Sequence, residues 1–451
     1  MTELLAERPA TTQAAPVPDA RRVRLLDALR GVALLGILLM NIPGFAMPNY
    51  FAEAFKSDPA SGNFWLNAAI TVLFEGKMRA LFGMVFGAGV LLFVSKKEQA
   101  GRPVTWLFYR RMLWLVLFGL VHAYLILWIG DILYLYGICG MLVYLFRNVR
   151  PAYLVLGVPL VAVGDFTAGT LFYRHVRAAR IAYVDASRAE SEGRAPTPAQ
   201  AEALGRWRDI ERTLIPNRED AKENTRKMKS DYATVAAYLR PLAFEFQTVF
   251  LPIEVWDSLA LMLLGLALYR WGFLTGAWAD RDYWRVLAVG YGVGLPLVCY
   301  SFYHDYRTRP TLEASLSRME AVPVEWVGLI YPFQRILLVL AHVSAITLLY
   351  KAGRARPAFR RLEAVGQMAF TNYIMQSVIC TLVFFGYGLN YFAELEFYQL
   401  YVVVLAVWAL QLVVSPLWLR SFYFGPLEWV WRSLTYWRRQ PFVRPVGGVP
   451  P

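Results

Sequence analysis

Ten apolar segments recur along the chain, and each is close to the length that a helix needs to cross a lipid bilayer. Runs of about 18 or more apolar residues indicate membrane-spanning helices. Hydrophobic residues make up 57% of the 451 residues, against about 45–50% in soluble domains. We therefore predict an all-α polytopic membrane helix bundle. The predicted spans are 28–47, 78–95, 111–128, 132–147, 151–173, 255–271, 284–302, 327–350, 365–388 and 398–419.

The basic residues of the short loops determine the predicted orientation. With the N-terminus placed in the cytoplasm, the inner short loops and their edges hold fifteen Lys and Arg residues and the outer ones hold six. Cytoplasmic loops are enriched in these residues, so both termini are predicted to be cytoplasmic. The same loop charge accounts for the formal net charge of +13, so we expect no nucleic-acid partner.

Composition divides the chain into five parts. The polar segment 1–20 is predicted to be a disordered cytoplasmic tail, since it lacks the basic start and apolar core of a signal peptide. Two membrane bundles of five spans each, 21–173 and 241–421, flank a charged stretch at 174–240. This stretch is predicted to be an extracytoplasmic helical insert, which either covers an entrance or is simply solvated. The segment 422–451 interleaves Trp with Arg and indicates an amphipathic helix on the inner headgroup surface.

Several short patterns limit the chemistry. Gly83 and Gly87 in LFGMVFGAG have the small-xxx-small spacing that lets two membrane helices approach closely. Cys139, Cys299 and Cys380 lie far apart within apolar runs and form no ligand spacing. The sequence contains no zinc-binding, nucleotide-binding or nucleophile-elbow motif. We expect no metal site and no tightly bound cofactor.

Five stretches, in order, carry a family resemblance: RLLDALRGVALLGILLMNI, FEGKMRALFGMVFGAG, LVHAYLILWIGDILYLYG, MAFTNYIMQSVICTLVFFGYG and GPLEWVWRSLTYWRRQP. Over about residues 21–442 the chain resembles the YeiB-like family of bacterial inner-membrane proteins, whose C-terminal half is catalogued as a domain of unknown function. The resemblance implies a multi-pass protein of the bacterial inner membrane. The first span is also similar to that of the transmembrane acyltransferases, which include the acyltransferase family 3 proteins and the lysosomal heparan-glucosaminide acetyltransferase.

This wider resemblance implies a reaction. Those enzymes transfer an acyl group from cytoplasmic acyl-CoA to a carbohydrate on the far side of the membrane. Their first span carries an Arg followed, after ten residues, by His or Asn, and Arg30 and Asn41 occupy these positions here. The heparan enzyme has its catalytic His a further eleven residues on, where this chain has Ala52. If the chain is an acyltransferase, its base must come from elsewhere.

His122 is the predicted base. It follows Arg111 by eleven positions on one span, about 16 Å of helix rise, so it lies past mid-membrane, and imidazole can accept a proton near neutral pH. The alternative is a structural His that is hydrogen-bonded to a neighbouring helix. Asp131 begins the next span, where it caps that helix, orients His122, or does both.

Arg30, Arg111 and Asn41 are the predicted donor-binding residues. The two guanidinium groups suit the phosphates of CoA, although basic residues at the inner ends of spans also serve as anchors. Asn41 precedes an expected helix break at Pro43 and Gly44. Its amide suits either a thioester carbonyl or a bond between helices.

Four more polar residues are predicted to bind substrate. Glu75 and Lys77 form either an interfacial charge cluster or part of the site. Asn372 and Gln376 share a helix face, which suits interhelical bonding or acceptor recognition. Four further ionisable residues lie within spans without a motif that connects them: Asp165, Asp257, Arg335 and His342.

Three functions are compatible with these residues. The first is a membrane acyltransferase, with acyl-CoA as the cytoplasmic co-substrate and a hydroxyl acceptor, such as an envelope carbohydrate or a similar small molecule, at the outer face. The second is a transporter or flippase of a small solute or lipid-linked compound, in which the same buried polar residues line a pathway. A membrane scaffold or sensor without turnover is the third. The lipid bilayer is an expected partner in all three, and the oligomeric state stays open.

Overall fold

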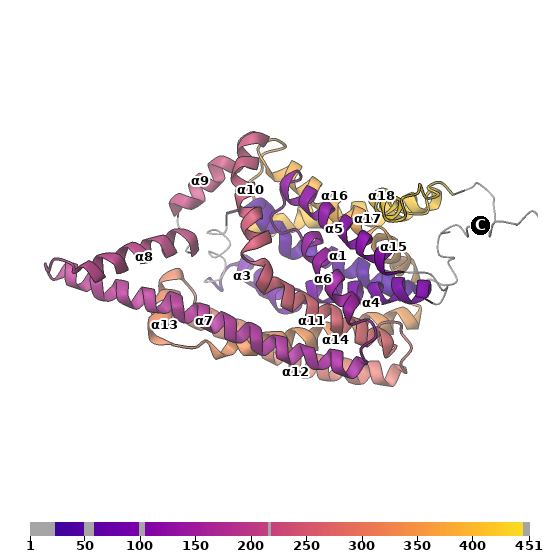
Figure 1. The fold of residues 1–451 in the computed structure, drawn as a ribbon, viewed down its shortest axis with the longest axis horizontal. Coiled ribbons are helices and arrows are strands. Elements are labelled where there is room, and N and C mark those ends of the chain that lie inside the picture. Colours follow the sequence, from indigo (N-terminus) through magenta and orange to yellow (C-terminus); the bar gives the residue numbers. More distant parts are fainter. Residues whose placement is uncertain (1–22, 49–57, 99–103, 215–217, 445–451) are drawn as a thin grey trace, which may run out of the picture.

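Helices form almost all of the regular structure. The computed structural model describes residues 23–48, 58–98, 104–214 and 218–444, so the predicted tail 1–20 and Ala52 lie outside the described residues. Within them there is no strand beyond one isolated bridge between Phe422 and Val443, and helices pack around one another (Figure 1). The helices are α1 (Arg24–Ala46), α3 (Gly62–Leu73), α4 (Lys77–Glu98), α5 (Thr105–Tyr124), α6 (Leu133–Leu145), α7 (Pro151–Ser191), α8 (Pro198–Leu214), α9 (Arg218–Met228), α10 (Tyr232–Thr248), α11 (Leu251–Arg270), α12 (Asp280–Thr308), α13 (Leu312–Ala321), the 3₁₀ helix η2 (Trp326–Leu329), α14 (Tyr331–Ala352), α15 (Arg356–Gln367), α16 (Ala369–Phe384), α17 (Phe397–Ser421) and α18 (Pro426–Tyr436).

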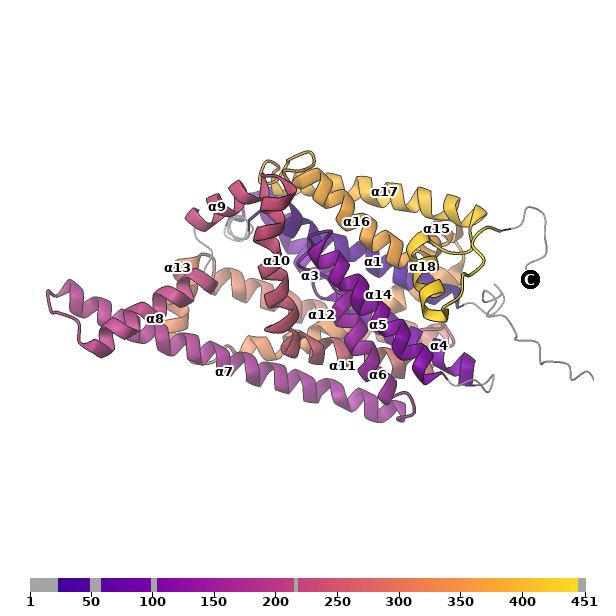
Figure 2. The ribbon, with the colours of Figure 1, turned by 45° about the horizontal axis from the view of Figure 1, so that its top comes forward.

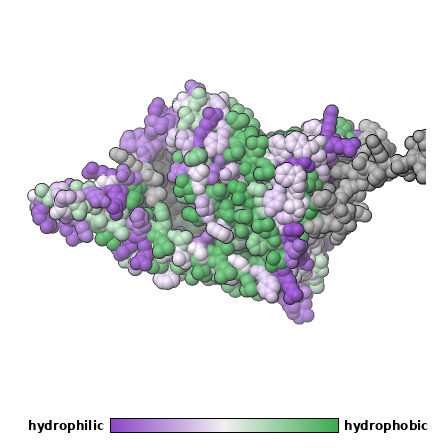
Figure 3. Space-filling view, in the orientation of Figure 1, coloured by the Kyte–Doolittle hydropathy of each residue, from purple (hydrophilic) through white to green (hydrophobic). Residues whose placement is uncertain are grey.

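The chain is a polytopic helical membrane protein, as predicted. Within the described residues, seven helical segments are long and apolar enough to cross a membrane, and α6 and α16 are shorter apolar helices. Hydrophobic side chains cover much of the middle of the molecule, whereas hydrophilic ones gather on the projecting part of α7 and α8 (Figure 3). The seven segments are Arg24–Ala46, Gly62–Ser95, Pro151–Ser191, Leu251–Arg270, Asp280–Thr308, Trp326–Ala352 and Phe397–Ser421.

Each of the ten predicted spans overlaps an α-helix, although the bounds differ by several residues in places. The predicted span 365–388 begins in the last turn of α15, which ends at Gln367 before α16 starts. The helix α3 was not predicted at all. The expected break at Pro43 and Gly44 is wrong, because α1 continues to Ala46.

A neighbouring helix explains why α1 continues through Pro43. Proline has no N–H, so it leaves the carbonyl four residues earlier without its helical hydrogen bond. That carbonyl belongs to Leu39, and the Tyr401 hydroxyl of α17 donates to it at 3.3 Å. Trp408 of the same helix donates to Leu35 O at 3.0 Å. α17 therefore supplies the donor that the proline removes.

Glycines let the helices α4 and α11 approach closely. A Cβ at Gly87 would collide with the Met262 carbonyl, and a Cβ at Gly265 would collide with the Met84 carbonyl. Any side chain at either position would force the two backbones apart. The helix contact predicted from the spacing of Gly83 and Gly87 is confirmed.

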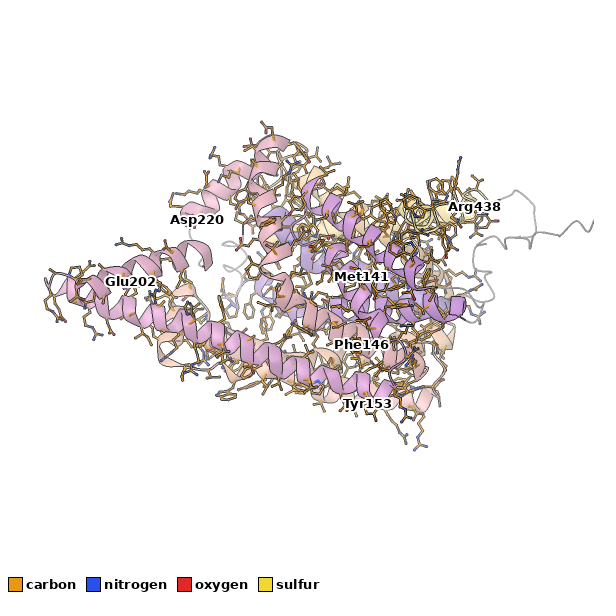
Figure 4. The ribbon with its side chains drawn as sticks, in the orientation of Figure 1. Met141, Phe146, Tyr153, Glu202, Asp220 and Arg438 are labelled. Atoms are coloured by element: carbon orange, nitrogen blue, oxygen red, sulfur yellow. The ribbon has the colours of Figure 1, made fainter. Side chains whose placement is uncertain are left out.

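The two ends of the bundle differ in architecture. The 41-residue helix α7 runs beyond the bundle and is followed by α8, which packs back against it (Figures 1 and 2). Tyr153, near the start of α7, lies beside the bundle, whereas Glu202 of α8 lies on the projecting part (Figure 4). Trp207 of α8 is fully buried against α7. We call the end of the bundle from which α7 and α8 project the hairpin end. The opposite end, which carries α15 and α18, is called the α18 end.

Candidate functional site

A chain of hydrogen bonds through three side chains links α5, α6 and α16. His122 Nδ1 lies 2.7 Å from Asp131 Oδ1, and His122 Nε2 lies 2.8 Å from Ser377 Oγ. The side chains of His122 and Asp131 are 0% and 1% exposed, and Ser377 is 2% exposed. These three residues, which we call the relay, bring together the two predicted catalytic residues and add a serine that the sequence did not single out.

The short connection between α5 and α6 places Asp131. The chain turns at Leu127, whose φ of 64° lies in the left-handed region. Asp131 then accepts hydrogen bonds from the backbone N–H groups of Leu133 at 3.1 Å and Tyr134 at 2.8 Å. These are the groups that an N-cap side chain satisfies at the start of a helix. Asp131 therefore caps α6 and binds the imidazole at the same time.

Close packing surrounds the relay. A Cβ at Gly119 of α5 would collide with the backbone of Tyr134 and lie 2.6 Å from Asp131 Oδ2, so only glycine fits there. Tyr373 of α16 packs edge-on against the imidazole of His122, with ring centroids 5.0 Å apart. Its hydroxyl accepts from Ile132 N at 3.3 Å. These contacts fix the position of the imidazole.

The order of the groups determines what the relay can do chemically. A carboxylate that accepts the Nδ1–H holds the imidazole in the tautomer whose Nε2 accepts a proton. Nε2 can then take the proton of the Ser377 hydroxyl, which is the arrangement of a Ser-His-Asp hydrolase. The same two hydrogen bonds also join three helices, so the geometry is compatible with the structural alternative.

Arg30 and Arg111 both lie toward the α18 end. Arg30 is paired with Asp27 at 2.8 Å. The Arg111 guanidinium stacks 3.6 Å from the ring centroid of Trp431 in α18, and Trp431 donates to Arg111 O at 2.8 Å. Arg30 and Arg432 are close enough to act on Arg111 electrostatically. The structure thus gathers Arg30, Arg111 and Arg432, which we call the basic cluster, from three separate helices.

The helix α18 is fixed to the bundle beside this cluster. Glu428 accepts hydrogen bonds from Thr371 N at 3.0 Å and Thr371 Oγ1 at 2.5 Å, at the start of α16. Burial raises the pKa of the Glu428 carboxyl above its usual value, against the opposite effect of these bonds. One face of the predicted interfacial helix is therefore docked on α5 and α16.

Asn372 and Gln376 join helices. Asn372 Nδ2 donates to Ser415 Oγ at 3.0 Å and to Val365 O at 3.1 Å. Gln376 Nε2 donates to Gln411 Oε1 at 3.0 Å, and Gln411 in turn donates to Asn372 O at 2.8 Å. All four polar side chains are buried. The structure favours interhelical bonding over acceptor recognition for this pair.

Glu75 lines a cavity of ≈ 430 Å³ at the hairpin end, between α1, α3, α12 and α17. We call it the α3 cavity. The last turns of α1, where Asn41 is half-buried, form part of its wall. Lys77 is buried instead and donates from Nζ to Thr71 O at 2.8 Å, near the C-terminal end of α3. Glu75 is thus available to a solute, whereas Lys77 satisfies a carbonyl in the last turn of α3.

The sequence did not reveal an ion-pair network that lines a second cavity of ≈ 430 Å³, the α7 cavity. Arg79 lies 2.7 Å from Glu254 and 3.3 Å from Asp257, and Arg335 donates to Asp257 at 3.0 Å. Asp165 faces the same space. The sequence signal for this network was a charged residue within each of these apolar segments.

Across the described residues, no three His, Cys, Asp or Glu side chains are grouped to hold a metal ion.

Comparison with known proteins places the chain in a family. Residues 268–438 match the family described as protein of unknown function, DUF418. The chain is 30% identical to the uncharacterized protein YeiB of Escherichia coli (strain K12) over 429 residues, which cover 91% of this chain and 95% of YeiB. The chain belongs to the YeiB-like DUF418 family. The predicted family resemblance is confirmed.

Other relatives match over the same length. The family member YxaH of Bacillus subtilis (strain 168), also named as uncharacterized, is 28% identical over 442 residues, covering 95% of this chain and 98% of YxaH. An uncharacterized 39.9 kDa protein from the amylase 3′ region of Bacillus acidopullulyticus is 25% identical over 429 residues, covering 95% of this chain and 98% of that protein. No solved structure matches this YeiB-like chain.

Proposed function

We propose that the chain is an acyltransferase of the bacterial inner membrane, which moves an acyl group from acyl-CoA to a hydroxyl acceptor through the relay. The observation that carries the proposal is the order Asp131, His122, Ser377, in which the imidazole can accept the serine proton. The three side chains are at most 2% exposed. Exclusion of water protects a thioester and an acyl-enzyme from hydrolysis.

The acyl donor is proposed to bind at the α18 end. The guanidinium groups of the basic cluster suit the phosphates of CoA, because a planar fork can make two parallel hydrogen bonds to one phosphate. Arg111 and His122 both lie on α5, separated by about 16 Å of helix rise. An extended pantetheine arm that follows α5 brings the thioester carbonyl to Ser377.

The proposed reaction has two halves. In the first, Ser377 Oγ attacks the thioester carbonyl and its proton passes to His122 Nε2. The C–S bond breaks, and the leaving CoA sulfur takes that proton. In the second, the acceptor hydroxyl attacks the ester on Ser377, its proton passes through His122 Nε2, and the ester bond breaks to restore the Ser377 hydroxyl. Asp131 stabilises the imidazolium in both halves.

The acceptor is proposed to enter from the hairpin end. Glu75 in the α3 cavity offers carboxylate oxygens to the hydroxyl groups of an envelope carbohydrate or a similar compound. The same cavity contains Asn67 and Tyr306, which add amide and phenol groups. This direction places donor and acceptor at opposite ends of the bundle.

The proposal also includes a membrane topology, in which ten helices span the bilayer and both termini are cytoplasmic. The distribution of basic residues in the short loops supports a cytoplasmic α18 end and a periplasmic hairpin end. Reporter fusions after Ala352 and at the C-terminus should indicate the cytoplasm, and a fusion near Gln200 should indicate the periplasm. A periplasmic C-terminus would reject this topology. The ten helices are α1, α4, α5, α6, α7, α11, α12, α14, α16 and α17.

The second candidate function is a transporter or flippase. The charged α3 and α7 cavities favour it, because ionisable residues within membrane segments often line solute pathways. A transporter moves its solute without forming a covalent bond to the protein. A covalent acyl intermediate therefore separates the two candidates.

Acyl labelling tests the proposal. Purified full-length protein is incubated with radiolabelled acyl-CoA without acceptor, denatured, and digested to map the label. Label on Ser377 is expected, and Ser377→Ala and His122→Ala should abolish it. Ser415→Ala removes another fully buried serine hydroxyl and should label like the wild type. Wild-type protein that binds acyl-CoA and gains no label, or equal label on Ser377→Ala, would refute the acyl-enzyme.

A further inference from the structure

The α7 cavity is a second candidate site, built from elements that do not form the relay. One face of α7 makes a wall, with Ala162, Asp165, Phe166, Gly169 and Tyr173. The first turns of α11 and α14 lie opposite. The volume of ≈ 430 Å³ falls within the range of about 300–1,000 Å³ that is usual for small-molecule pockets.

All but one of the charged side chains that line this cavity have an opposite charge beside them. Asp165 is the exception, because no described residue forms an ion pair or a hydrogen bond with its carboxylate. A single negative charge is therefore left unbalanced within the cavity. The paired groups are Arg79 with Glu254, Arg335 with Asp257, Arg318 with Glu325, and Arg309 with Asp305.

Asp165 lies on the face of α7 that lines the cavity, not on the face that is uncovered. The opposite face of this helix is apolar and uncovered, with Leu160, Val163 and Phe172 each more than half exposed. Asp165 is half-buried and faces the cavity instead. A carboxylate within a membrane segment is costly, and such residues face a partner or a solute pathway.

Aromatic rings line the same space. Phe166 and Tyr173 come from α7, and Tyr331 comes from α14. Aromatic rings attract cations, most strongly where water is excluded, and the Arg335 guanidinium already lies 5.2 Å from the Tyr331 ring centroid. A carboxylate beside aromatic faces recognises an ammonium group. A bare divalent metal ion would need about six oxygen ligands instead.

We propose that the α7 cavity binds an organic cation with an ammonium group, and that Asp165 is its counter-ion. Two sources share this chemistry. One is a free amine solute that enters from the hairpin end. The other is the ammonium headgroup of a lipid that enters beside α11, where Ile253 and Trp256 are each more than half exposed. The proposal goes beyond the acyltransferase and does not rest on it.

Binding of small ammonium probes tests this site. Delipidated full-length protein in detergent is titrated with choline, with ethanolamine, and with 3,3-dimethylbutan-1-ol, the uncharged isostere of choline. Saturable binding of an ammonium probe is expected, with no binding of the alcohol. Asp165→Asn should weaken binding about tenfold or more, since it removes a charged partner. It should still fold, because Asp165 has no described partner to lose.

A matched variant and a lipid comparison complete the experiment. Asp185→Asn changes an exposed Asp on the same helix, outside the cavity, and should leave the dissociation constant unchanged. In nanodiscs, a weaker apparent affinity with phosphatidylethanolamine than with phosphatidylglycerol alone identifies a headgroup as the source, and equal affinities identify a free amine. No ammonium binding, equal binding of the alcohol, or unchanged affinity in Asp165→Asn would overturn the proposal.

Discussion

The carboxylate of Asp131 binds the imidazole of His122 through one oxygen and the first turn of α6 through both. Oδ1 lies 2.7 Å from His122 Nδ1 and 3.1 Å from Leu133 N, and Oδ2 lies 2.8 Å from Tyr134 N. A substitution at Asp131 therefore acts on the base and on the start of a helix together. Activity and stability must be measured on the same variant to tell these effects apart.

Asp131→Asn should separate the two roles. Asn caps a helix about as well as Asp, so the free energy of unfolding should change by less than about 1 kcal/mol. The imidazolium loses its partner charge, so acyl transfer should fall by about 10²-fold or more. Melting temperature and transfer rate, taken from one preparation, check both. A variant as active as the wild type would show that Asp131 is a cap only.

Gly119→Ala should damage the relay through sterics. The new Cβ would press on the backbone of Tyr134 and on Asp131 Oδ2, and forced overpacking costs about 1–3 kcal/mol. Both thermal stability and turnover should fall. Gly157→Ala is the control, since a Cβ there meets nothing within 4 Å, and it should leave both unchanged. Equal stability and turnover of the two variants would mean that the connection around Asp131 can shift to accommodate the new Cβ.

The positions of the helices could be predicted because hydropathy is a local signal. His122 and Asp131 could also be connected, since they lie nine positions apart along the chain and the intervening turn is short. Ser377 could not, because it reaches His122 from 255 residues away and a serine next to Gln376 looks like any other polar residue of a membrane helix. Only the packing of α16 on α5 brings the two side chains together.

Other features depend on contacts that no single segment encodes. Pro43 predicts a helix break, but the Tyr401 hydroxyl satisfies the carbonyl that the proline leaves free. Asp257 and Arg335 lie 78 residues apart, so each looked isolated until the fold paired them. Local rules identified the charged residues within the spans, and the tertiary structure determined their partners.

Substitutions in the basic cluster should weaken donor binding. If Arg30 and Arg111 hold the phosphates of CoA, affinity for acyl-CoA should fall in both Arg→Ala variants and should fall with salt in the wild type, because salt screens the attraction between the guanidinium groups and the phosphates. Arg111→Lys should not restore it fully, since an ammonium group lacks the bidentate fork. Titration calorimetry measures the dissociation constant of acyl-CoA for each variant. Unchanged affinity for acyl-CoA in both alanine variants would show that the donor does not bind at the α18 end.

Tyr401→Phe should destabilise α1. The variant loses the hydrogen bond to Leu39 O, and an interhelical hydrogen bond in a membrane protein contributes about 0.6 kcal/mol on average. Tyr398→Phe, on the same helix and 55% exposed, is the control and should unfold like the wild type. Thermal unfolding in detergent compares the two. No difference between them would show that α1 tolerates the free carbonyl.

The release of CoA by the His122→Ala variant tests the acyl-transfer proposal most directly. Acyl-CoA is mixed with purified protein and the free CoA thiol is followed with time, alongside acyl-CoA affinity and melting temperature. If His122 is the base, release should slow by about 10²–10⁴-fold while affinity is unchanged. Stability should fall by about 1–3 kcal/mol whichever role is correct, because the variant leaves the buried Asp131 carboxylate and Ser377 hydroxyl without the imidazole, so the release rate is measured well below the melting temperature. Release at the wild-type rate would contradict the catalytic role and leave His122 as a link between helices.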